Sequence, residues 1–192
     1  KKKEIYEEDR IDKILNKNSN TKDPFSHANF NFCEIPQVLD EDNYKEIFNE
    51  VIEDSKLTFN IAHAPIHFPF FFNDYYNMDK KDLYEQRIMR ALEISAIIGV
   101  KSIVIHIGTT LDNEGKYDFK ASVKENIKYL NKFVEFAVKN NIMVAIENGT
   151  NMEKEVTPTI DELIQIVDYY NKLYKKEVLG ICFDFGHANV AK

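Results

Sequence analysis

The chain has 192 residues, of which 44% are hydrophobic and 30% charged, a composition that predicts one soluble domain with ample material for a core. Its net charge of −7 disfavours a partner coated in phosphates, because nucleic-acid binding draws on clustered Lys and Arg. No apolar run reaches the roughly 18 residues of a membrane span, and residues 1–4 lack the apolar stretch of a secretory signal. We therefore expect a cytoplasmic protein that makes no contact with a membrane.

Short β-branched runs alternate with long helical patterns from about residue 57 onward, which is typical of a parallel sheet built from βαβ units. A helix-like stretch at 4–15 precedes them. The five predicted strands are 30–35, 57–62, 102–107, 142–147 and 179–185. The two cysteines, Cys33 and Cys182, both lie in these runs, where a small buried thiol is commoner than a disulfide partner.

Between the predicted strands the apolar residues take the steps of three and four that an amphipathic helix requires. Three such stripes are Tyr84, Ile88, Ala91, Leu92 and Ser95; Val123, Ile127, Leu130, Val134 and Ala137; and Leu163, Val167 and Tyr170. Gly99 stands where a left-handed residue would end the first helix. Thr159 and Glu162 form the two ends of a capping box at the start of the third.

Alternation along each strand separates the side chains that face the helices from those that face the other side of the sheet. In strand 102–107 the three isoleucines face the helices, and His106 faces inward. By the same count Glu147, Cys182 and Asp184 face inward on the later strands. The polar residues thus lie on the inner face at the C-terminal ends, where a barrel of parallel strands assembles its chemistry.

Four strand ends deliver His63, His106, Glu147 and the pair Asp184 and His187 to one place. Imidazole and carboxylate groups suit a divalent ion such as manganese, magnesium, cobalt or zinc, and the lack of a cysteine cluster argues against a thiolate site. Taken singly, a strand-end histidine is more often a hydrogen-bonded packing residue. An inward carboxylate that ends an apolar strand is costly unless it is paired or binds a metal.

Asp184 and His187 are three residues apart, a step that puts side chains on opposite faces of a regular strand. We expect Gly186 to bend the chain so that both can face the mouth of the barrel.

Four segments carry a resemblance to a known family: IAHAPIH (61–67), IVIHIG (103–108), VAIENG (144–149) and GICFDFGHAN (180–189). In order and spacing they resemble the sugar phosphate isomerase/epimerase family, over residues 28–192. The resemblance implies a TIM (β/α)8 barrel with a divalent metal at its mouth. By this resemblance Glu147 binds the metal and acts as acid/base group, Asp184 binds the metal, and His187 contacts the substrate. His63 and His106 then lie on the substrate side.

The chain is expected to be a single domain, 1–192, that holds about strands 2 to 6 of the eight. The first strand and the C-terminal strands have no counterpart in it, and in the family the latter supply a further metal-binding histidine and a second catalytic glutamate. We read the chain as a fragment, and we expect it to be inactive alone.

The function implied is the isomerisation or epimerisation of a sugar or sugar phosphate. The metal would polarise the carbonyl of the substrate, and Glu147 would remove and return a proton on the neighbouring carbon. The partner is then a small-molecule sugar, and a homo-oligomer is left open. A dehydratase that uses the same site lies within this interpretation.

The same five residues also resemble abasic-site endonucleases of the endonuclease IV kind, in which they hold a zinc cluster that attacks DNA. Against this alternative stand the acidic net charge and the sequence FGHAN (185–189), in which the cysteine usual before that histidine is absent. A third alternative is a barrel that has kept its fold but binds no metal.

Overall fold

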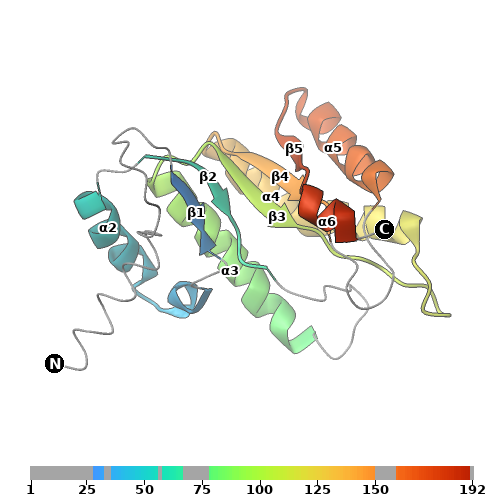
Figure 1. The fold of residues 1–192 in the computed structure, drawn as a ribbon, viewed down its shortest axis with the longest axis horizontal. Helices are drawn as coiled ribbons and strands as arrows, with labels where there is room; N and C mark the ends of the chain where they lie inside the picture. The colour runs from blue at the N-terminus through green and yellow to red at the C-terminus, as the bar shows by residue number, and fades with distance from the viewer. Residues whose placement is uncertain (1–27, 33–35, 56–57, 67–77, 150–158, 191–192) are drawn as a thin grey trace.

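A single parallel sheet forms the centre of the computed structural model, which describes residues 28–32, 36–55, 58–66, 78–149 and 159–190. Its strands are β1 (Ala28–Asn31), β2 (Phe59–His63), β3 (Ser102–His106), β4 (Met143–Glu147) and β5 (Leu179–Cys182). They pair in chain order, each parallel to the next (Figure 1). All five therefore end at the same edge of the sheet.

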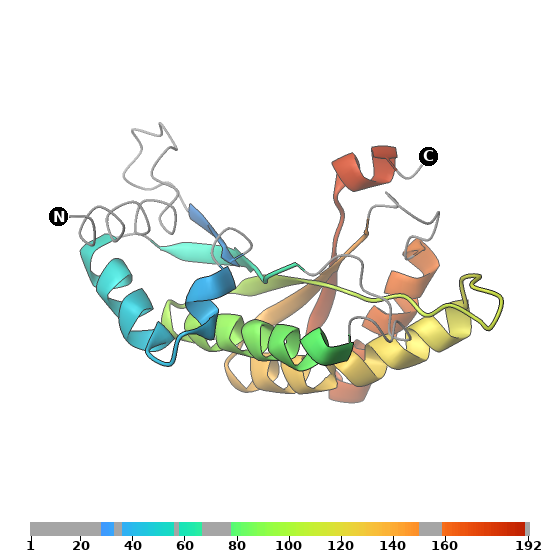
Figure 2. The same cartoon turned by 90° about the horizontal axis from the view of Figure 1, so that it is seen from below.

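Helices connect the strands and lie along one side of the sheet. The first crossover holds the 3-10 helix η2 (Pro36–Asp40) and helix α2 (Tyr44–Ser55), and the later ones hold α3 (Met78–Ile97), α4 (Phe119–Lys139) and α5 (Ile160–Tyr174). Figure 2 shows these helices beneath the curved sheet, with the short helix α6 (Phe185–Val190) beyond the end of β5. A curved parallel sheet with helices on its outer side is the wall of a barrel.

The core lies between the sheet and these helices, as the alternation predicts. Ile103, Ile105 and Ile146 have no exposed surface, and Met143, on the opposite face of the sheet, is 41% exposed. From α4, the predicted stripe contributes Leu130, Val134 and Ala137, which are fully buried. Two further expectations are confirmed: Gly99 adopts a φ of 78° after α3, and the Thr159 hydroxyl caps α5 by accepting a hydrogen bond from the Glu162 amide.

The prediction for the end of β5 is wrong. The strand ends at Cys182 instead of residue 185, and α6 begins at Phe185. Asp184 stops the strand because it caps this helix: its Oδ1 accepts a hydrogen bond from the His187 amide at 2.8 Å, and its carbonyl accepts one from the Ala188 amide at 3.1 Å. A helical turn thus brings Asp184 and His187 to one side, whereas we expected a bend at Gly186.

The predicted capping box is confirmed only in its threonine half. The carboxylate of Glu162 accepts hydrogen bonds from the Tyr117 hydroxyl and from the Asn126 amide, which come from the β3–α4 connection and from α4. The strand predicted at 30–35 begins and ends earlier, because β1 is Ala28–Asn31 and Phe32 already lies in a 3-10 turn. Two expectations concern residues outside the described part: the helix at 4–15 and the burial of Cys33. Cys182 is a free thiol. None of the described helices is long and apolar enough to cross a membrane.

Candidate metal centre

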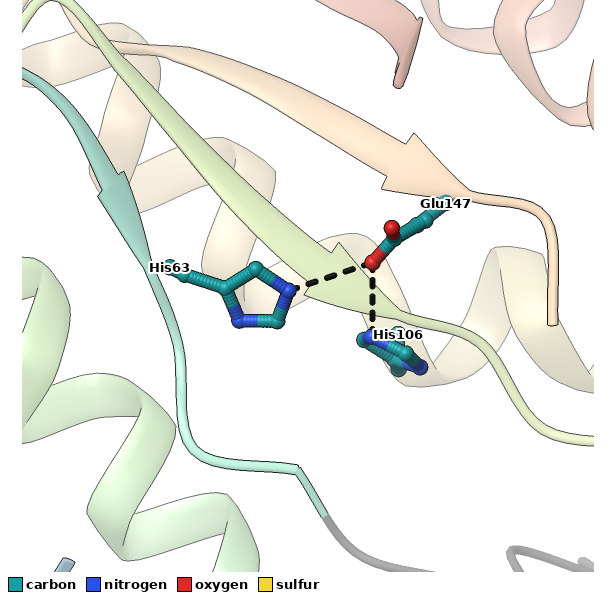
Figure 3. Close-up of side chains that lie close together, drawn as sticks. All are labelled: His63, His106 and Glu147. Carbon is teal, nitrogen blue, oxygen red and sulfur yellow. Dashed lines mark hydrogen bonds and ion pairs between the residues drawn. The ribbon is translucent and has the colours of Figure 1, made fainter. Parts of the chain in front are cut away.

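The last residues of three neighbouring strands bring two imidazoles and a carboxylate together. His63 ends β2, His106 ends β3 and Glu147 ends β4. The parallel register sets His106 directly opposite Glu147, so their side chains leave the sheet on the same face. Figure 3 shows His63 and His106 approaching the Glu147 carboxylate from two directions. Alternation along the strands predicted that His106 and Glu147 would share this face, and His63 was expected beside them because it follows the end of a predicted strand.

The buried carboxylate of Glu147, only 5% exposed, is the centre of the cluster. Its Oε2 lies 3.1 Å from Nε2 of His63 and 2.7 Å from Nε2 of His106. Its Oε1 lies 3.7 Å from Nδ1 of His187, on the other side of the group. Two groups of three residues can therefore each offer a metal three ligand atoms that lie within 4.8 Å of one another. The first triad is His63, His106 and Glu147, and the second triad is Glu147, Asp184 and His187. Glu147 belongs to both.

Charge and burial set the protonation of this cluster. Burial opposes ionisation of Glu147, but the hydrogen bonds from His106 and then His63 hold the pKa of this carboxyl well below its usual range. Glu147 is therefore an anion. Burial lowers the pKa of His106, against the attraction of Glu147. Burial and then the nearby Glu147 and Asp184 raise the pKa of the Cys182 thiol, so this residue is a neutral thiol and no thiolate ligand.

The tautomers of two histidines fit a bound cation. Nδ1 of His63 lies 2.8 Å from the Ala64 carbonyl, and Nδ1 of His187 lies 2.8 Å from the Asn148 carbonyl. A carbonyl only accepts, so each Nδ1 is the donor, and the lone pair of a neutral ring is on Nε2. Fixing one ring nitrogen on a carbonyl is how proteins orient metal-binding imidazoles.

The distance between His63 and Glu147 agrees with this fit. Nε2 of His63 lies 3.1 Å from a carboxylate oxygen of Glu147, so these two atoms are joined either by a proton on Nε2, as a hydrogen bond, or by a shared cation. Two ligands that share an ion at ~2 Å and a tetrahedral angle are roughly 3.3 Å apart. The donor set of the site, imidazole nitrogen and carboxylate oxygen, therefore suits a divalent ion.

Asn148 is a site residue that the sequence analysis missed. Its side-chain Oδ1 accepts from the Asp184 amide at 2.6 Å, its Nδ2 donates to the Asp184 carbonyl at 3.0 Å, and its own carbonyl holds His187. This one asparagine fixes two of the three residues of the second triad, Asp184 and His187. Strand alternation turns Asn148 away from the inner face, so the alternation argument does not select it. The one sequence feature that points to Asn148 is its position directly after Glu147 in VAIENG.

Residues 24–192 match a protein family described as xylose isomerase-like TIM barrel. The chain belongs to this family. Its five parallel strands and outer helices, together with the barrel structures that it resembles, confirm the predicted fold class.

Three proteins show how this xylose isomerase-like chain relates to others. A curated relative named "Probable endonuclease 4", from Staphylococcus carnosus (strain TM300), is 28% identical over 136 residues, which are 69% of this chain and 43% of the relative. The chain therefore spans less than half the length of that protein. A D-tagatose 3-epimerase-like protein of known structure has a TM-score of 0.62 at 23% identity, over 84% of this chain and 57% of its own. A Thermus thermophilus protein soaked with zinc chloride has a TM-score of 0.60 at 18% identity, over 84% and 58%.

Proposed function

We propose that this chain carries the metal site of a sugar or sugar-phosphate isomerase or epimerase, in which Glu147 moves the proton. The observation that carries the proposal is the buried, anionic Glu147 at the meeting point of three strand ends, with imidazoles on both sides. In a TIM barrel this rim is where substrates bind. A small sugar as partner and a cytoplasmic location belong to the same proposal.

Glu147 and Asp184 are the proposed ligands of the ion, and His63, His106 and His187 are proposed to contact the substrate. A divalent ion bound there would supply a Lewis acid for the carbonyl oxygen of the substrate. Glu147 takes the proton from the carbon beside that carbonyl and returns it. Because its pKa is held low, Glu147 is a weak base when free, so it depends on a substrate whose proton has been made acidic.

Two observations support an isomerase over a nuclease. The chain has a net charge of −7, which is unfavourable for DNA. A solved structure similar to it in fold is described as D-tagatose 3-epimerase-like.

An endonuclease IV-type nuclease is the second candidate. The contacts of His63 and His106 with one oxygen of Glu147 favour it, because imidazole nitrogens are good zinc ligands. The curated relative from Staphylococcus carnosus bears the name of such a nuclease. In this alternative both histidines hold an ion instead of facing a sugar.

The test compares the wild type with Glu147→Gln and with Glu135→Gln, whose exposed carboxylate lies near the C-terminal end of α4. Because the fragment is expected to be inactive alone, each variant is made in the full-length protein. Each protein is assayed against a panel of ketoses and their phosphates, and against abasic DNA, with its bound metals measured by elemental analysis. We expect isomerisation with about one divalent ion per chain, a loss of about 10²- to 10⁴-fold in Glu147→Gln and no loss in Glu135→Gln. Cleavage of abasic DNA by a zinc cluster would replace the proposal with the second candidate.

A further inference from the structure

A buried network of hydrogen bonds lies behind the end of β3, outside the candidate metal centre. Its central residue is Asn126 of α4, which has no exposed surface. The Oδ1 of Asn126 accepts from the Gly108 amide at 2.9 Å, and its Nδ2 donates to the Gly108 carbonyl at 2.7 Å. A side-chain amide offers the same donor and acceptor as a peptide group. Asn126 therefore holds Gly108 as a neighbouring strand would.

The hydrogen bonds between Asn126 and Gly108 begin where the strand pairing of β3 ends. The pairing of β2 with β3 ends at His63 opposite Val104, and the pairing of β3 with β4 ends at His106 opposite Glu147. Gly108 follows His106 by two residues. The backbone just after His106 is therefore held by Asn126 of α4, at Gly108, and not by a neighbouring strand.

Glu162 fixes the orientation of this amide. Asn126 Nδ2 also donates to Glu162 Oε1 at 2.9 Å, and the Tyr117 hydroxyl donates to Oε2. Glu162 is fully buried, and its described contacts are neutral: Asn126 from α4, Tyr117 from the β3–α4 connection and, at its own amide, Thr159 from the start of α5. An acceptor at Nδ2 prevents the amide from turning over, since the reversed amide would set its oxygen against a carboxyl oxygen.

We propose that Asn126 and Glu162 are positioning residues for His106: through Gly108 they set where the His106 imidazole stands against the Glu147 carboxylate. The separation of 2.7 Å between His106 Nε2 and Glu147 Oε2 leaves little tolerance for movement of the strand end. The inference rests on the role of His106 in the proposed function. It adds two residues, from two helices, that touch neither the substrate nor the ion.

The experiment compares Asn126→Ala with Asn171→Ala. Asn171 makes the same kind of contact at the opposite end of the sheet, where its amide holds the Val178 and Leu179 amides and the Leu179 carbonyl at the start of β5. Both variants lose a side-chain clamp and are expected to lose thermal stability. Only Asn126→Ala should shift the ¹⁵N resonances of the His106 imidazole and, in the full-length enzyme, raise KM for the sugar or lower kcat by about tenfold.

A second pair tests Glu162 and covers the case in which Asn126→Ala does not fold. Glu162→Ala should reproduce the shift of the His106 resonances, and Glu162→Gln should restore them, because its amide keeps an oxygen that accepts from Asn126. His106 resonances and kinetic constants that match those of Asn171→Ala in both Asn126→Ala and Glu162→Ala would overturn the inference. The His106 resonances are measured without any catalytic turnover. If they shift in a protein that has no isomerase activity, the result supports the positioning role of Asn126 and Glu162 and contradicts only the proposed isomerase function.

Discussion

Glu162→Gln should remove a pH dependence from the stability of the protein. Burial raises the pKa of Glu162 from 4.5 to about 7, against hydrogen bonds from Tyr117 and Asn126 that lower it. Between these two pKa values the folded protein keeps a proton that the unfolded chain has lost, so the free energy of unfolding falls as the pH rises through this range. One pKa unit is worth about 1.4 kcal/mol, so the fall that Glu162 causes is about 3 kcal/mol.

Urea unfolding at pH values from about 4 to about 8 measures this contribution. The wild type should lose about 3 kcal/mol relative to Glu162→Gln over this range, mostly between pH 4.5 and 7, and no more above it. Glu114→Gln is the matched control, because the Glu114 side chain is 73% exposed, and its profile should run parallel to that of the wild type. Parallel profiles for the wild type and Glu162→Gln would refute the argument that burial sets the protonation of this carboxyl.

Three further predictions concern the candidate metal centre and are tested in the full-length protein. Asp184→Asn and Glu147→Gln should each weaken the binding of a divalent ion, because each removes an anionic oxygen ligand. Calorimetric titrations that show unchanged affinity and stoichiometry in both variants would contradict the proposed metal site. The double variant His63→Ala and His106→Ala should keep one tightly bound ion per chain in elemental analysis but raise KM or lower kcat. Asn148→Ala should weaken ion binding by about tenfold in the same titrations, since Asp184 and His187 lose their shared support, whereas an unchanged affinity would show that α6 alone holds them.

The parts of the fold that the sequence predicts are those with a strong periodic pattern. Strand β4 follows an alternation that separates Val144 and Ile146, which are buried against the helices, from Met143 on the open face. The same parity predicted that His106 and Glu147 would meet, because parallel strands in register bring their last inward residues to one edge. Both results need only the period of the strand and the direction of the chain.

The parts that escaped prediction depend on local hydrogen bonds that compete with the periodic pattern. Phe183 and Phe185 continue the alternation of β5, but the Asp184 side chain is a helix cap, and this ends the strand early. Glu162 fits a capping box by its spacing, yet its carboxylate is used by Tyr117 and Asn126, which are distant in the sequence. Periodicity carries no information about a partner that is 36 or 45 residues away.

The proposed isomerase and the alternative nuclease differ in what His63 and His106, which contact one oxygen of the Glu147 carboxylate, would bind. Oε2 of Glu147 lies against His63 and His106, and Oε1 lies on the side of His187. In an isomerase with a single ion, the ion belongs with Asp184 on one side, and the two imidazoles on the other are available to a sugar. In a nuclease with a zinc cluster, His63 and His106 would be metal ligands together with Glu147, Asp184 and His187. Removing the imidazoles of His63 and His106 therefore changes the metal content in the second case and only the kinetics in the first.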